Sequence, residues 1–260
     1  MAVGKVMDER YWDGVAGDYD GEIFSVLAND RNEVITSKIR EYGDKGKEAC
    51  DFGCGVGKFV PALAENFGRV WAVDLSEELL EQAKEECGDL ENVTYLRKDL
   101  SQPKVKVAKV DFGLSVNVAI MGERKVRRGI FRTMKKYVRE GGRLVVVVPS
   151  LESALYADYR LVQWNLRAKW SMEEAVKEVA EAERGGVGGV RQGLVEIEGV
   201  ATKHYLAEEL AAMFGELGFE VEGVEKVEYS WGTEFSEPPA WMGEPYPWDW
   251  LTVLRKTGNG

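Results

Sequence analysis

The stretch Asp-Phe-Gly-Cys-Gly-Val-Gly-Lys-Phe at residues 51–59 constrains the fold of this chain more than any other segment. A strand pattern leads into three glycines at alternate positions, Gly53, Gly55 and Gly57, and a helical pattern follows from Val60. Glycine is favoured where the backbone takes a positive φ or where a ligand approaches the main chain. A strand that turns on glycines into a helix N-terminus predicts a ligand-binding cleft.

Further stretches of the chain alternate strand and helix patterns, as an open α/β sheet does. An apolar strand pattern at 69–74 ends in Asp74, and Ser76 caps the helix that follows. The carboxyl ends of parallel strands share one rim of the sheet, and ligands bind at that rim. Two later strands bring more polar side chains to the rim: Asp99 follows the strand at 93–96, and Asn117 ends the strand at 110–117. A fifth strand is expected at 143–149.

The spacing of the glycines argues against one class of cofactor, the nicotinamide dinucleotides. A nicotinamide dinucleotide site has the pattern Gly-x-Gly-x-x-Gly, with an acidic residue about twenty positions later. In this chain the third glycine, Gly57, comes one residue too early for that pattern. The register that accommodates a pyrophosphate is lost, so the sequence disfavours a dehydrogenase.

In their order and spacing these segments resemble the class I S-adenosylmethionine (SAM)-dependent methyltransferases, over essentially the full length of the chain. Asp51–Gly57 matches the first motif of that family, and Asp74 matches its ribose-binding acid. Asp99 matches the acid near the adenine, and 111–120 matches the segment that passes under the methionine part. The resemblance therefore implies SAM as the cofactor.

The N-terminal run Tyr11–Asp20 resembles the Trp-Asp…Ala…Tyr-Asp lead-in of the small-molecule branch of the family. That lead-in usually forms a helix that closes over the cofactor. Together the matches imply this set of cofactor-binding residues: Tyr19, Asp51, Gly53, Cys54, Gly55, Gly57, Asp74, Leu75, Asp99, Leu100, Asn117 and Val118.

The resemblance also implies a Rossmann-like α/β fold. Its seven-stranded sheet is mostly parallel with an antiparallel last strand, has helices on both faces, and here carries a helical insertion after strand five. In this family the last two strands are antiparallel neighbours, and we expect them at 219–229 and 251–255. We expect one domain, 1–260, made of four parts: a helical cap at 1–45, a SAM-binding core at 46–149, an inserted lid or substrate region at 150–203, and a C-terminal helix with two strands at 204–260.

Two regions depart from the minimal fold, and both leave the sheet on the cofactor rim. The insertion contains an amphipathic helix pattern through Leu155 and Tyr159, then a second helix with a capping-box pattern from Ser171. Glycines at 185–189 interrupt that helix, and a short strand or extended arm follows from Leu194. We expect the apolar stripe of the inserted helices to pack in part against the N-terminal segment, residues 11–24.

The second departure is 230–249, where prolines and tryptophans concentrate. We expect this loop and the insertion to wall the space in front of the SAM methyl group. The alternative is that the tryptophans only anchor a long loop by burial. The first interpretation gives four substrate-binding candidates: Tyr11, Tyr159, Trp231 and Trp241.

Methyl transfer from a sulfonium needs mainly alignment and exclusion of water. A general base is needed only when the nucleophile arrives protonated. His204, the single histidine, is the catalytic candidate because histidine titrates near neutrality. A histidine at a helix start is also typical of a cap or a surface position.

Composition limits the partners of the protein. With 34 basic and 45 acidic residues the formal charge is −11, so nucleic acid is not expected as a partner. The basic run Arg124–Arg128 lies opposite an apolar helix side, which favours a solvated face. Asn117–Ile120 also lacks the (Asn/Asp)-Pro-Pro-aromatic pattern of methyltransferases that act on nucleic-acid bases.

The three cysteines are odd in number and lack metal spacing, so we expect a cytoplasmic protein without a bound metal. Apolar runs are only strand-length and residues 1–10 do not form a signal peptide, so no membrane association is expected. The sequence favours an enzyme that methylates a small-molecule substrate. Its alternatives are a protein methyltransferase and a SAM-binding protein without turnover, and the acceptor atom and oligomeric state stay open.

Overall fold

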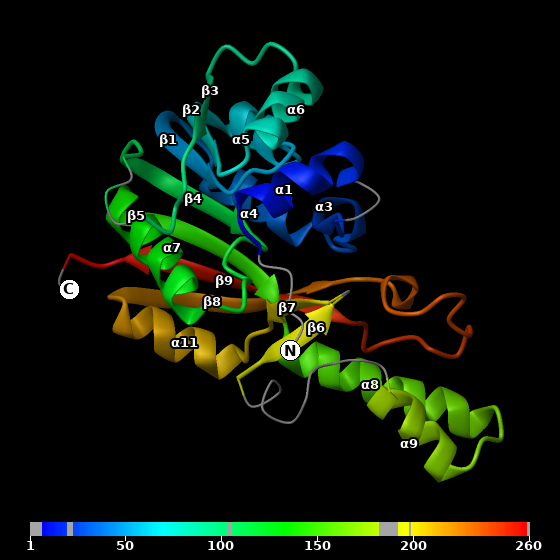
Figure 1. Ribbon diagram of the computed structural model, residues 1–260. Coiled ribbons are helices and arrows are strands. Elements are labelled where there is room, and N and C mark those ends of the chain that lie inside the picture. The colour runs from blue at the N-terminus through cyan, green and yellow to red at the C-terminus, as the bar shows by residue number, and fades with distance from the viewer. Residues whose placement is uncertain are drawn as a thin grey trace.

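The computed structural model describes residues 7–19, 23–102, 104, 106–181, 192–197 and 199–258. Its main sheet has seven strands in the order β3-β2-β1-β4-β5-β9-β8 (Figure 1). Strands β1 to β5 run parallel, and β9 runs antiparallel to both of its neighbours. The predicted Rossmann-like sheet with an antiparallel last strand is confirmed. The strands are β1 Asp44–Phe52, β2 Phe67–Asp74, β3 Val93–Arg97, β4 Val110–Val116, β5 Val138–Pro149, β8 Phe219–Glu228 and β9 Trp248–Lys256.

Helices cover both faces of this sheet (Figure 1). α7 and α11 share one apolar core with the sheet, and α4 and α5 share another on the opposite face, where α6 packs beside α5. Short helices at the N-terminus form a cap near the rim. The helices are α1 Glu9–Val15, η1 Ala16–Asp18, α3 Val26–Asn29, α4 Val34–Tyr42, α5 Val60–Asn66, α6 Glu77–Cys87, α7 Arg124–Tyr137, α8 Leu151–Arg167, α9 Met172–Glu181, α11 Ala207–Glu216 and η2 Trp231–Thr233.

Local chemistry sets several of these boundaries. Ser76 caps α6, because its Oγ accepts a hydrogen bond of 3.2 Å from the Leu79 amide. Ser171 and Glu174 form the predicted capping box at α9: the Glu174 amide donates to Ser171 Oγ, and the Ser171 amide donates to the Glu174 carboxylate. The valines of β5 are buried as one continuous run, as expected of a central strand covered on both faces.

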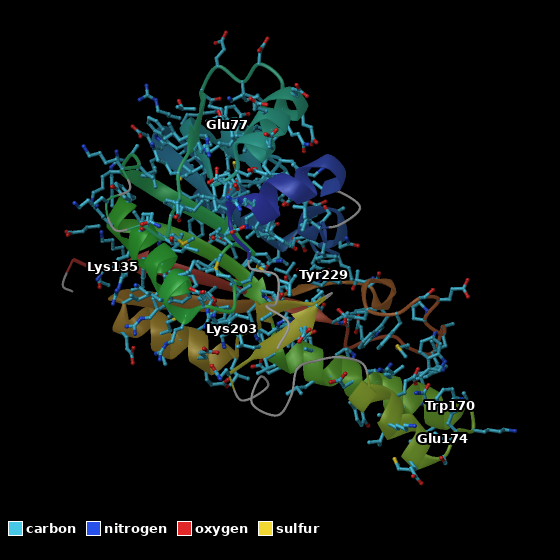
Figure 2. All side chains as sticks on the ribbon, viewed as in Figure 1. Glu77, Lys135, Trp170, Glu174, Lys203 and Tyr229 are labelled. Carbon is cyan, nitrogen blue, oxygen red and sulfur yellow. The ribbon has the colours of Figure 1, made fainter. Side chains whose placement is uncertain are left out.

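The insertion after β5 is helical first and extended later. α8 and α9 project from the sheet, and Figure 2 places Trp170 and Glu174 at their far end. The chain then returns through a two-stranded hairpin, β6 Leu194–Ile197 and β7 Val200–Lys203. The predicted glycine break at 185–189 lies outside the described residues. No helix in the described ranges has the length and apolar character needed to span a membrane.

The loop between β8 and β9 packs on α8. Trp231 is 2% exposed, and its ring stacks on Phe235 and lies against Tyr156 of α8. Its indole N–H donates to the Gly243 carbonyl at 2.9 Å. The structure thus supports the alternative in which tryptophan burial anchors the loop. The apolar stripe of α8 differs from its expected packing, because Tyr159 stays 56% exposed instead of being covered by the N-terminal segment.

Candidate functional site

The turn after β1 is fixed by its glycines. Gly53 has a φ of +83°, and a Cβ atom there would clash with the side chain of Val118. A Cβ on Gly55 would meet the hydroxyl of Tyr19 at 2.8 Å, and one on Gly57 would meet Cys87 Sγ at 2.8 Å. The three glycines therefore allow β4, the N-terminal cap and α6 to approach the turn closely.

Replacement of Gly53 by alanine is expected to destabilise the protein by about 2–4 kcal/mol, from the left-handed backbone and from overpacking against Val118. Chemical denaturation would measure the change. Gly14→Ala is the matched control, because this exposed helix position has no atom within 4 Å of the added methyl group. It should be neutral or slightly stabilising. Equal stabilities of the two variants would contradict the assignment of strain to Gly53.

Asp74 ties the turn to the end of β2. Its Oδ2 accepts a 2.8 Å hydrogen bond from the Gly55 amide, and its Oδ1 accepts a 3.0 Å bond from the Ser76 amide. Burial raises the pKa of Asp74, and the hydrogen bonds from Ser76, Gly55 and Leu75 act against that increase. One carboxylate thus shapes both the glycine turn and the start of α6.

A cavity of about 1110 Å³ opens beside the turn. This volume is at the upper end of the range for small-molecule sites, roughly 300–1,000 Å³. The N-terminal cap, the ends of β1 to β4, the start of α7 and the β6–β7 hairpin all contribute to it. Its lining residues are Met7, Asp8, Glu9, Arg10, Trp12, Tyr19, Gly53, Gly55, Asp74, Leu75, Leu79, Lys98, Asp99, Leu100, Ser101, Val116, Asn117, Val118, Met121, Gly122, Glu123, Val126, Ile130, Glu196, Gly199 and Ala201.

A second carboxylate, Asp51, is buried close to Asp74. Burial raises the pKa of Asp51 to about 8, and the charge of Asp74 adds to the increase. Asp51 Oδ2 has no hydrogen-bond partner in the part of the chain that the structure describes. A buried carboxylate oxygen without a donor fits a ligand that brings a positive charge or an N–H group.

Asp99 lies in a different environment at the end of β3. Partial burial acts to raise its pKa, but hydrogen bonds from Ser101 and Gln102 outweigh this effect and lower it. The Ser101 amide donates to Oδ1 and the Gln102 side chain donates to Oδ2, each at 2.8 Å. Asp99 therefore stays ionised at neutral pH, whereas Asp51 is largely protonated.

The far half of the cavity is built by the segment between β4 and α7. The guanidinium of Arg127 donates to the carbonyls of Met121 and Gly122 at 2.5 and 2.7 Å. The Lys203 amide donates to the Ile120 carbonyl at 2.6 Å, which fixes the β6–β7 hairpin against the same segment. Arg127 is buried, so the predicted solvated face of the basic run does not include this residue.

The structure brings most of the predicted cofactor residues to one cavity. Asp51, Cys54 and Gly57 are not among its lining residues, but each lies within two positions of Gly53 or Gly55, which are. The turn glycines, the strand-end acids and the segment after β4 meet there because parallel strands end at one rim. The lining members of the predicted set are Tyr19, Gly53, Gly55, Asp74, Leu75, Asp99, Leu100, Asn117 and Val118.

The substrate and catalytic candidates are not among the residues that line this cavity. Tyr159 is exposed on α8, and Trp231 is buried within the β8–β9 loop. The Cζ atom of Arg167 lies 3.8 Å from the centroid of the Trp241 ring. Tyr11 packs edge-on against Trp12, which does line the cavity. His204 is buried after β7, and its Nδ1 lies 3.2 Å from the Thr202 carbonyl.

Sequence reasoning missed the residues of the far half. Val126 and Ile130 had a signal, because the helix pattern at 124–137 places them on its apolar side, but that side is equally typical of core. Glu196 and Ala201 lie in the insertion at 150–203, which was expected to border the site, but no sequence feature distinguished the hairpin from the inserted helices. Trp12 lies within the N-terminal lead-in at 11–20, but its residue type alone does not distinguish a cavity position from a core position.

Comparisons with known proteins agree with this geometry. Residues 49–142 match a family model described as "Methyltransferase domain". Phosphoethanolamine N-methyltransferase 1 of Triticum aestivum is 29% identical over 155 residues, which cover 55% of this chain and 30% of the relative. The chain thus spans about a third of the length of the curated relatives it matches.

Solved structures share the fold at low sequence identity. A SAM-dependent methyltransferase from Methanosarcina mazei has a TM-score of 0.59 at 15% identity, covering 85% of this chain and 97% of its own. Magnesium protoporphyrin IX methyltransferase from Synechocystis PCC 6803, solved with bound SAH, has a TM-score of 0.56 at 14% identity. That match covers 96% of this chain and 97% of the other.

Proposed function

We propose that this class I methyltransferase, identified by its fold and its methyltransferase domain, binds SAM and transfers the methyl group to a small-molecule acceptor. The observation that carries the proposal is the convergence of the glycine turn, Asp74, Asp99 and Asn117 on one cavity. The SAH complex of the Synechocystis structure supports the choice of cofactor.

The residues present fit SAM in three respects. Gly53 and Gly55 line the cavity, so the backbone of the glycine turn borders the space for a ligand. Asp51 is buried behind the turn, outside the cavity lining, and its Oδ2 lacks a donor among the described residues, so a positive charge in the cavity would favour its ionised form. Asp74 lines the cavity with a carboxylate that can accept hydrogen bonds from ribose hydroxyls, and Asp99 and Leu100 form a polar and an apolar contact for the adenine.

When bound, SAM supplies an electrophilic methyl group on a sulfonium sulfur. The chain's own residues then have two tasks, alignment and exclusion of water. Tyr19 packs on Gly55 and Trp12 lines the same side, so the N-terminal cap shields the site from solvent. His204 does not line the cavity, and we assign the reaction no obligatory base on this chain.

We assign the acceptor to the far half of the cavity. Met121, Val126, Ile130 and Ala201 give this half an apolar wall, and Glu123 adds a charged group at the start of α7. Because α7 and the β6–β7 hairpin enclose this half of the cavity, the space between them suits a small-molecule acceptor. The name of the wheat phosphoethanolamine N-methyltransferase, which states a small acceptor, supports this choice.

SAM or its demethylated product should raise the melting temperature, whereas a nicotinamide dinucleotide should not, because only ligands of the native state stabilise it. At a ligand concentration about 100 times the Kd, the expected stabilisation is about 2.7 kcal/mol. Thermal scans with each ligand, and with adenosine as a control for weak adenine binding, measure the effect. Stabilisation by NAD alone would reject the methyltransferase assignment.

The acceptor class is tested by transfer of label. The protein is incubated with SAM labelled in the methyl group and with a cell extract, and the products are separated by size. We expect the label in the small-molecule fraction. Label in the protein fraction would favour the protein methyltransferase, and SAM binding without any transfer would favour a SAM-binding protein.

A further inference from the structure

A buried carboxylate that does not line the cavity is hydrogen-bonded to a residue that does. Asp249, at the start of β9, is 8% exposed. Its Oδ2 accepts a 2.8 Å hydrogen bond from the Tyr229 hydroxyl and a 3.3 Å bond from Asn117 Nδ2. Asn117 lines the cavity directly after β4, but Asp249 and Tyr229 are absent from its lining residues.

This connection crosses three strands at the cofactor rim. The Asn117 amide donates to the Val147 carbonyl of β5 at 2.9 Å, and Asp249 pairs with Pro149 at the end of the same strand. Asn117 has a φ of +53°, a left-handed conformation that non-glycine residues seldom adopt. The neighbouring Val118 packs on Gly53 of the turn, so the backbone at Asn117 sets part of the cavity floor.

The opposite side of Tyr229 contacts the N-terminal cap. Its ring packs edge-on against Phe24 with the centroids 4.8 Å apart. Nearby, the Ile23 amide donates to the Tyr19 carbonyl at 2.8 Å, and the Arg31 amide donates to the Glu228 carbonyl at 3.1 Å. Figure 2 shows Tyr229 where the last strands meet the N-terminal segment. Tyr229 thus contacts both Phe24 of the N-terminal cap and Asp249, the carboxylate that is hydrogen-bonded to Asn117.

We propose that Asp249 and Tyr229 are positioning residues of the methyltransferase site. They hold Asn117 at the floor of the cavity and the cap segment at its rim, and thereby raise the affinity for SAM without touching it. The inference rests on the proposed function, because it assigns the cavity to SAM.

The charges around this pair are compatible with the role. Burial raises the pKa of Asp249 to about 6, with a contribution from Glu234, while the hydrogen bonds from Tyr229 and Asn117 act against the increase. Burial, Asp249, Asp30 and Glu234 raise the pKa of Tyr229 well above its ordinary value, so its hydroxyl stays a donor. At neutral pH the ionised Asp249 accepts both bonds, and protonation near pH 6 weakens them.

The test compares three variants by calorimetric titration with SAM. Asp249→Asn removes the charge, and Tyr229→Phe removes the hydroxyl but keeps the ring on Phe24. Thr252→Val is the matched control, because this buried residue lies on the same strand and its hydroxyl has no hydrogen-bond partner among the described residues. At pH 7.5 we expect the Kd for SAM to rise about tenfold in the first two variants and less than twofold in the control.

The pH profile separates positioning from simple loss of stability. The ratio of the Asp249→Asn Kd to the parent Kd should shrink toward one at pH 5, because the parent carboxyl is then protonated. Melting curves without ligand confirm that each variant is folded. Parental SAM affinity in both variants, or a ratio that does not change with pH, would overturn the inference while the parent still binds SAM. A parent that does not bind SAM would overturn the proposed function, and the inference with it.

Discussion

Replacement of Asp51 by asparagine is expected to stabilise the ligand-free protein at high pH and to weaken its binding of SAM. Asp51 is buried, and its pKa is raised from an ordinary 3.8 to about 8. A carboxyl group whose folded pKa is raised contributes full stability below pH 4, and that contribution is lost as the pH rises toward 8. Above pH 8 the ionised, buried carboxylate therefore opposes folding, and asparagine removes this cost.

The size of the effect follows from the size of the pKa shift. One pKa unit corresponds to about 1.4 kcal/mol, so at pH 9 we expect Asp51→Asn to be more stable than the parent by about 6 kcal/mol. At pH 4 the two proteins should be nearly equal in stability. Urea denaturation at a series of pH values measures the difference, and calorimetry at pH 7.5 measures the loss of SAM affinity.

Asp111→Asn is the control for Asp51→Asn. Asp111 lies at the other end of the sheet, where its carboxylate accepts hydrogen bonds from Arg139 at 2.5 Å and from the Glu48 amide at 3.0 Å. Its replacement should lower stability and leave SAM binding unchanged. A difference between Asp51→Asn and the parent that stays constant from pH 4 to pH 9 would contradict the proposed burial of charge at Asp51.

The sheet and the cofactor rim could be predicted because their signals are local. Gly53 and Asp74 each stand at the end of a strand pattern, and the parallel arrangement brings strand ends together without further information. Where an observed strand boundary differs from the predicted one, the cause is also found in the pairing at that position. β5 begins at Val138 and not at 143, because Val138 pairs with Val110 before an irregularity in the ladder.

For the far side of the cavity the sequence indicated the insertion at 150–203 but not which part of it lines the cavity, because that depends on the direction in which long connections leave the sheet. The tryptophan-rich loop at 230–249 starts on the rim as expected, but Trp231 packs against Tyr156 and Ala157 of α8. The hairpin reaches the cavity because Lys203 and Thr202 bond to the segment at 120–121. The bond between Asn117 and Asp249 joins positions 132 residues apart and has no sequence signal.

Replacement of Asp74 by alanine is expected to abolish most of the affinity for SAM. The change removes the proposed acceptor for the ribose hydroxyls, and it also removes the acceptor of the Gly55 and Ser76 amides. Each buried donor left without a partner costs about 1–3 kcal/mol. Only the two ribose hydroxyls lose their acceptor in the bound state alone, and their combined cost of about 2–6 kcal/mol corresponds to an increase in the Kd for SAM of about 30-fold or more.

Glu77→Ala is the control for Asp74→Ala. Glu77 is an exposed acid three residues further along the chain, and its carboxylate pairs with Arg97 at 2.5 Å. Its replacement removes the same charge from the same region and should leave SAM affinity unchanged. Calorimetry measures both affinities, and melting curves show whether Asp74→Ala is folded, because the loosened turn should also lower its melting temperature. If folded Asp74→Ala binds SAM as tightly as the parent, then Asp74 does not hold the ribose and the cofactor site must be assigned elsewhere.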